Sequence, residues 1–98
     1  MALDLSFNEA RTRAALLFSH PKGNIITLEL VQQMRAALED LSRLRSLKLV
    51  TIEGAGADFS LGADIAEHVA GVIDRVLPET HELIYDWLEF AAPTAAIV

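Results

Sequence analysis

The sequence contains no cysteine and few basic residues. Without cysteine there is no disulfide, no thiolate nucleophile and no Cys-ligated zinc site. The chain carries 8 Lys and Arg against 14 Asp and Glu, for a net charge of −6. Nucleic acids and anionic membrane surfaces attract clustered cations, so this balance disfavours both as partners. No apolar run approaches the roughly 20 residues of a membrane-spanning helix, and residues 1–13 lack the order of a secretory signal. We therefore expect a cytoplasmic protein.

Apolar residues are plentiful by contrast. They make up 52% of the 98 residues, and charged residues make up 22%, which is a globular composition. A chain of this length forms one domain, here residues 1–98, and buries only about 60–65% of its unfolded surface. The mean hydropathy of +0.32 is high for so small a chain. We therefore expect part of its apolar surface to contact other protein.

Hydrophobic periodicity predicts two strands and a helix in the first half of the chain. Residues 3–7 alternate between apolar and polar, as in a half-buried strand, and the apolar run at 14–18 predicts a second strand. Thr27 is suited to cap a helix over about 28–45. That helix is predicted from apolar residues at spacings of 3, 4 and 3, namely Val31, Met34, Leu38 and Leu41.

The second half predicts a further strand, two helices and a final strand. Residues 47–53 favour a buried strand. Residues 65–77 are typical of a helix, which Pro78 breaks or kinks before another helix runs to about Phe90. Residues 94–98 predict the last strand, so the order β-β-α-β-α-α-β indicates an α/β domain. Four acidic residues are expected on the solvent face of the last helix: Glu79, Glu82, Asp86 and Glu89.

The glycine-rich segment 54–68 is the most informative for function. It follows a predicted strand and leads into a predicted helix, an order that can direct free backbone N–H groups at an anion. The dinucleotide fingerprint fails, because Phe59 stands where a third glycine would follow Gly54 and Gly56. The phosphate-binding P-loop fails too, since no Gly-Lys-Ser/Thr is present. From spacing alone, a tight turn shaped by its glycines is the simpler interpretation.

The residues of this segment carry a family resemblance. The pattern Gly56-x-Asp58-Phe59-Ser60-x-Gly62-Ala63-Asp64-Ile65 resembles the signature loop of the crotonase (enoyl-CoA hydratase/isomerase) superfamily. The upstream Pro21-Lys22-Gly23-Asn24, followed by a long helix and a strand, agrees with it. The resemblance covers residues 14–98 and is strongest at 54–68. It implies a crotonase-like (ClpP/crotonase) spiral of β-β-α units, of which this truncated chain is the N-terminal part, well under half the usual family length.

The resemblance also implies a site. Family members hold an acyl-CoA thioester oxygen in an oxyanion hole of two backbone N–H groups, and the first of these matches Ala63. A fixed donor stabilises the charge that develops on that oxygen, and removing one such donor costs about 10²–10³ in rate. Lys22 and Gly23 match positions along the CoA nucleotide, and Leu61 and Ile65 match positions that enclose the adenine. The full set of implied CoA contacts is Lys22, Gly23, Leu61, Gly62, Ala63, Asp64 and Ile65.

The sequence departs from the family pattern at important places. Ala66 stands where many relatives carry a lysine for the CoA phosphate. The second oxyanion glycine and the catalytic glutamates correspond to positions after Val98, so we expect this chain alone to be inactive. In full-length form the resemblance implies a lyase that adds water to an enoyl-CoA or dienoyl-CoA. Glu67-His68 after the signature loop is similar to cyclic dienoyl-CoA hydratases of aromatic-acid degradation. Isomerisation and decarboxylation stay open within the family.

The resemblance implies an acyl-CoA partner, with coenzyme A as part of the substrate, no separate cofactor and no metal. His20, His68 and His81 form no HExxH or comparable ligand motif. Family members are commonly trimers or hexamers, so a homo-oligomer is expected. One alternative is a non-catalytic CoA-binding or assembly module derived from the same fold. Another is an unrelated α/β domain with a coincidental loop.

Overall fold

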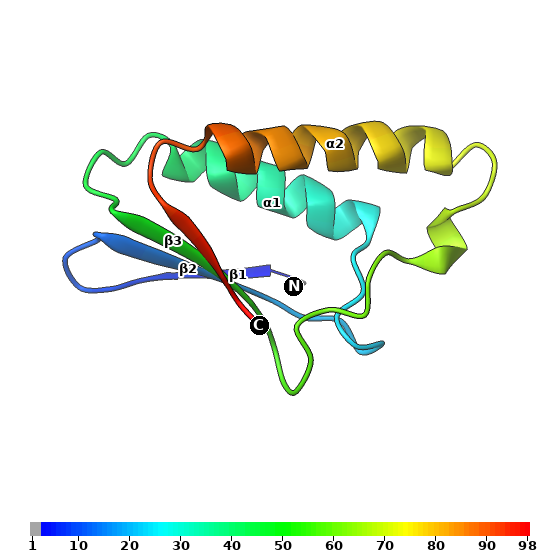
Figure 1. Ribbon diagram of the computed structural model, residues 1–98, viewed down its shortest axis with the longest axis horizontal. Helices are drawn as coiled ribbons and strands as arrows, with labels where there is room; N and C mark the ends of the chain where they lie inside the picture. The colour runs from blue at the N-terminus through cyan, green and yellow to red at the C-terminus, as the bar shows by residue number, and fades with distance from the viewer. Residues whose placement is uncertain (1–2) are drawn as a thin grey trace.

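A four-stranded mixed sheet, covered on one face by two helices, forms the protein (Figure 1). The computed structural model describes residues 3–98. Two successive parallel crossovers that step in the same direction along a sheet place their helices on the same face, because such crossovers are right-handed. The elements are β1 (Leu3–Phe7), β2 (Arg13–Phe18), α1 (Leu28–Leu41), β3 (Leu49–Gly54), the short 3-10 helix η1 (Ile65–Glu67), α2 (Ile73–Glu89) and β4 (Thr94–Ile97). The predicted α/β class is confirmed.

The sheet has the order β1-β2-β3-β4, with the first pair antiparallel and the other two parallel. Its register places Leu5, Leu16, Ile52 and Ala96 in one row across the strands. Within β2 every second side chain is buried. The alternation predicted for residues 3–7 is confirmed only in part, because Leu3 is buried but Leu5 is exposed. No helix within residues 3–98 is both long enough and apolar enough to cross a membrane.

Helix α1 supplies much of the core. The predicted apolar stripe is buried, joined by Leu30, and Thr27 caps the helix by accepting a hydrogen bond from the Leu30 N–H at 3.1 Å. The helix ends at Leu41 rather than near residue 45, so its predicted C-terminal end is wrong. Ser42 stops it: its hydroxyl donates to the Glu39 carbonyl at 2.6 Å, and the chain then tightens into turns.

The single helix predicted over 65–77 is wrong in its first part. Residues 65–67 form only η1, the chain from 68 to 72 is not helical, and α2 begins at Ile73. Gly71 lies in this break with a φ of +89°, outside the right-handed helical region. The break predicted at Pro78 is also wrong, because α2 continues through it. Proline in a helix interior costs about 3 kcal/mol. Burial of Val76 and Leu83, on either side of Pro78 in the helix, offsets this cost.

Two loops leave the sheet side by side. Phe18 and Gly54 are partners at the carboxyl ends of the parallel strands β2 and β3. The segments that follow, residues 19–27 and 55–64, therefore begin as neighbours (Figure 1). Ligand sites of open α/β sheets lie outside the carboxyl ends of their strands. The fold thus brings together the two segments in which the sequence places its candidate residues.

Candidate functional site

The loops 19–27 and 55–64 are joined by successive backbone hydrogen bonds. The Leu61 N–H donates to the Gly23 carbonyl at 3.0 Å. Further along, Ile26 donates from its N–H to the Gly62 carbonyl at 2.8 Å and accepts from the Asp64 N–H at 3.0 Å. Ile26 and Ala63 thereby form a short parallel bridge. All the residues that the sequence assigns to CoA lie in these loops or directly after them, so the structure brings them together.

Asn24 fixes the first of these loops to the second. Its side chain is buried, with a relative exposure of 4%, and its backbone takes the left-handed conformation at φ +56°. The amide nitrogen donates to the carbonyl oxygens of Ala55 at 2.7 Å and Asp58 at 2.8 Å. The amide oxygen accepts from the His20 N–H at 2.9 Å. One side chain thus satisfies three backbone groups of two loops.

Two glycines permit a close approach of the chain. A Cβ at Gly54 would overlap the carbonyl oxygen of Phe59, and one at Gly23 would overlap the Leu61 side chain. Phe59 also packs edge-on against Phe18, with ring centroids 5.3 Å apart, which anchors the loop to the core. The glycines of this segment therefore do shape a tight turn, and that turn sets the path of the chain toward Ala63.

The N–H of Ala63 donates no hydrogen bond to any group within residues 3–98. In a parallel bridge the residues on either side of Ala63 bond to Ile26, while Ala63 itself directs its N–H away from that strand. Gly62 precedes it at φ +110° and donates its own N–H to the Ser60 hydroxyl at 3.0 Å. The result is a free, exposed donor at a position whose two neighbours are both fixed.

The chain after Ala63 is held by two carboxylates. Asp64 caps η1 by accepting from the Ala66 N–H at 3.0 Å. Glu67, at the end of η1, accepts from the Leu28 N–H at 2.9 Å. Two apolar side chains of this region face solvent, since Leu61 is 71% and Ile65 is 86% exposed.

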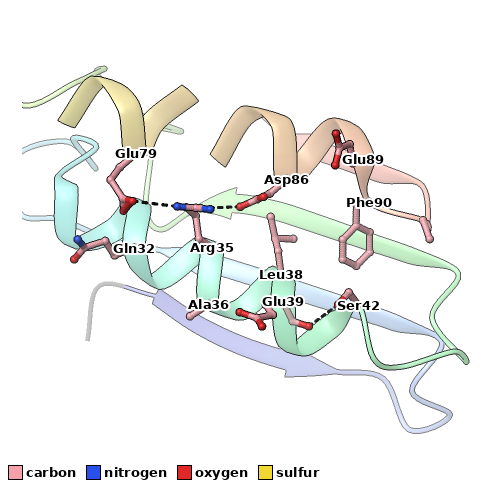
Figure 2. A pocket seen from close by; sticks show the side chains of 11 residues that line it. Gln32, Arg35, Ala36, Leu38, Glu39, Ser42, Glu79, Asp86, Glu89 and Phe90 are labelled. Atoms are coloured by element: carbon pink, nitrogen blue, oxygen red, sulfur yellow. Dashed lines mark hydrogen bonds and ion pairs between the residues drawn. The ribbon is translucent and has the colours of Figure 1, made fainter. Parts of the chain in front are cut away.

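A hollow lies elsewhere, between α1 and α2 (Figure 2). It has a volume of about 620 Å³, and Arg35 crosses it to reach Glu79 at 3.0 Å and Asp86 at 2.9 Å. The hydrogen bond that Arg35 donates to Asp86, helped by the charges of Asp86 and the nearby glutamates, raises the pKa of Arg35. The prediction that Glu79 and Asp86 lie on a purely solvent face is wrong, because both are two-thirds buried and ion-paired. Arg35 thus links the two helices across this hollow, and Ala63 does not line it.

A smaller hollow of about 240 Å³ lies under the C-terminal part of α2. Ile52, Trp87 and residues 94–96 line it. Ala63 is an exposed residue and lines neither of these two hollows.

Comparison with known proteins shows which fold holds these two loops. No family model matches the sequence. Over 78 residues, 80% of this chain, the sequence is 30% identical to the cyclohexa-1,5-dienecarbonyl-CoA hydratase of Thauera aromatica. The structure matches all of this chain to human enoyl-CoA hydratase domain-containing protein 3 with a TM-score of 0.89 at 18% identity. It matches 98% of the chain to the enoyl-CoA hydratase of Mycobacterium smegmatis with a TM-score of 0.88, also at 18% identity. In fold and in sequence, the chain is therefore similar to the crotonase superfamily of enoyl-CoA hydratases.

The chain covers only part of the length of these proteins. It spans 30% of the length of the Thauera relative, 40% of the human protein and 39% of the mycobacterial one. The crotonase fold expected from the signature loop is confirmed, and so is the expectation that the chain is truncated relative to the family.

The sequence does not predict the roles of two residues that hold this loop in place. Asn24 stands in a predicted loop and Glu67 in a subfamily pattern, and neither position indicates a structural contact. A signal for Asn24 exists, since asparagine is one of the few residues that adopt the left-handed conformation readily. Glu67 gives no such signal, because its partner Leu28 lies 39 residues away.

Proposed function

We propose that this chain supplies the first oxyanion donor of an enoyl-CoA hydratase-type enzyme, with the Ala63 N–H directed at the thioester oxygen. The observation that carries the proposal is the free N–H between two fixed neighbours. A donor held before the reaction stabilises the enolate-like oxygen without reorganisation, which makes such groups effective in catalysis. Gly62, at φ +110°, gives the chain the turn that exposes this donor.

The surroundings of Ala63 support a CoA-binding role. Leu61 and Ile65 offer exposed apolar surface on either side of it, suited to enclosing the adenine ring. Lys22 is exposed on the neighbouring loop, next to Gly23, whose carbonyl holds Leu61. Its ammonium group would meet a CoA phosphate as a point charge, which matters in a chain of net charge −6. With Gly62 and Asp64 as backbone contacts, these residues make up the proposed CoA-binding strip.

The proposed substrate is a cyclic dienoyl-CoA. The relative that is 30% identical to this chain is, by its name, a cyclohexa-1,5-dienecarbonyl-CoA hydratase. The signature loop followed by Glu67-His68 supports the same subfamily. We assign no acid–base pair to residues 3–98, so we expect the chain by itself to bind the thioester without hydrating it.

We also propose that the protein works as a homo-oligomer, a trimer or hexamer. Support comes from apolar side chains that remain exposed, because large exposed apolar patches commonly mark protein contacts. Several of them follow the outer side of α2: Leu77, Ile84, Tyr85 and Leu88.

Calorimetric titration with crotonyl-CoA and with cyclohexa-1,5-dienecarbonyl-CoA tests the proposal. An amide-to-ester replacement at residue 63, with lactate in place of alanine, removes the N–H and keeps the side chain. It should weaken thioester binding about 3- to 10-fold, the value of one hydrogen bond. Ala63→Pro should weaken it at least as much, whereas Ala63→Gly keeps the N–H and should bind normally.

Undiminished affinity of the ester variant would contradict the role of Ala63. Thioester binding without hydration by an enzyme of full family length would favour the alternative, a non-catalytic CoA-binding module of the same fold.

A further inference from the structure

Glu67 joins two parts of the chain that the backbone bridge does not reach. Its Oε1 accepts from the N–H of Leu28, the first residue of α1, at 2.9 Å. This contact fixes the end of η1, which begins two residues after Ala63, to the start of a helix buried in the core. The segment that carries the free N–H is thus held at Gly62 and Asp64 by Ile26, and then again at Glu67 by Leu28.

We propose that Glu67 is a positioning residue for the oxyanion donor, a proposal that rests on the proposed function of Ala63. Backbone hydrogen bonds to Gly23 and Ile26 hold the segment as far as Asp64, and within the described residues η1 has no backbone bond to the rest of the chain beyond its own turn. The Glu67 contact supplies this second anchor, because η1 is a single short turn that begins directly after Asp64. The direction of the Ala63 N–H then follows the axis of α1 rather than the motions of an open loop.

Helix capping alone does not account for Glu67. Thr27 already caps α1 through the Leu30 N–H. Glu29 provides a second carboxylate in the first turn, where it complements the helix dipole. Within the described residues its side chain accepts a hydrogen bond only from Gln33 of the same helix, at 3.3 Å. Glu67 is the carboxylate at this helix start that comes from the donor segment. Glu29 is therefore a matched control that shares the dipole effect and lacks the connection.

Residual dipolar couplings of the ¹⁵N-labelled 98-residue protein read the direction of the Ala63 N–H directly, without ligand. Glu67→Ala should reorient this vector together with those of residues 64–67, while couplings in β1 to β3 stay unchanged. Glu67→Gln keeps an acceptor oxygen and should restore the native couplings, and Glu29→Ala should leave them native. Titration of the same four proteins with crotonyl-CoA should show affinity weakened about 3- to 10-fold in Glu67→Ala only.

The two measurements separate the two proposals. Native Ala63 couplings in Glu67→Ala would overturn the positioning role, whether or not the thioester binds. Reoriented couplings with no thioester binding by the wild-type protein would support the positioning role and contradict the proposed function.

Discussion

The side-chain amide of Asn24 donates a hydrogen bond to the carbonyl oxygen of Asp58 at 2.8 Å, across 34 residues of sequence. A second bond from the same nitrogen reaches Ala55 at 2.7 Å. These contacts hold the glycine-rich loop against the loop that carries Lys22. The shape of the proposed CoA-binding strip therefore depends on a buried amide that is not one of the proposed CoA contacts.

Replacing Asn24 tests this dependence. Asn24→Ala removes three hydrogen bonds from a buried site and leaves a non-glycine residue in the left-handed conformation, so it should destabilise the protein by about 2–4 kcal/mol. Asn24→Gly loses the same bonds without the steric penalty and should be about 1 kcal/mol more stable than the alanine variant. Urea unfolding measures both. If the alanine variant unfolds with a free energy within about 0.5 kcal/mol of the wild type, Asn24 does not hold the two loops together.

Two glycines of the same loop should respond differently to alanine. At Gly54 the new methyl group would meet the backbone of Phe59, which cannot move without shifting the loop, so we expect a loss of about 1–3 kcal/mol or more. At Gly56 there is open space but a φ of +79°, so only the conformational cost of about 1 kcal/mol applies. Thermal unfolding should rank Gly54→Ala below Gly56→Ala. The opposite order would show that the close approach at Gly54 is wrong.

The link between the helices through Arg35 should make a modest contribution. Arg35 and Asp86 are each about one-third exposed, so solvent screens the pair, and a double-mutant cycle with Arg35→Ala and Asp86→Ala should give about 1 kcal/mol of coupling. The pKa of Arg35 is raised, so its contribution is fully present below the unfolded value and is lost only as the pH rises through the folded value. The coupling should therefore be equal at about pH 7 and pH 9. A marked fall at the higher pH would contradict this.

Local patterns predicted most of the fold. Periodicity located α1 because its buried residues recur along one stripe, and Thr27 marked its start. The helix predicted over residues 65–77 is wrong in part for a physical reason. The apolar composition of these residues suits a helix, but Gly71 takes a left-handed backbone conformation that composition does not reveal. At Pro78 the sequence predicts a helix break where the helix continues, because burial of Val76 and Leu83 outweighs the local preference of proline.

The candidate site was predictable where it depends on sequence-local features and hidden where it depends on long-range contacts. The signature loop located Ala63 and the CoA strip from adjacent residues. The contacts of Asn24 with Asp58 and of Glu67 with Leu28 join positions more than 30 residues apart, and no spacing rule connects them. Those contacts appear only once the parallel strands β2 and β3 place their carboxyl ends together.

A crystal structure of the protein with a bound acyl-CoA thioester tests the central claim most directly. The account predicts that the Ala63 nitrogen lies about 2.7–3.1 Å from the thioester oxygen, with the adenine against Leu61 and Ile65. A thioester oxygen bound by other groups, with the Ala63 N–H facing solvent or an internal acceptor, would contradict it.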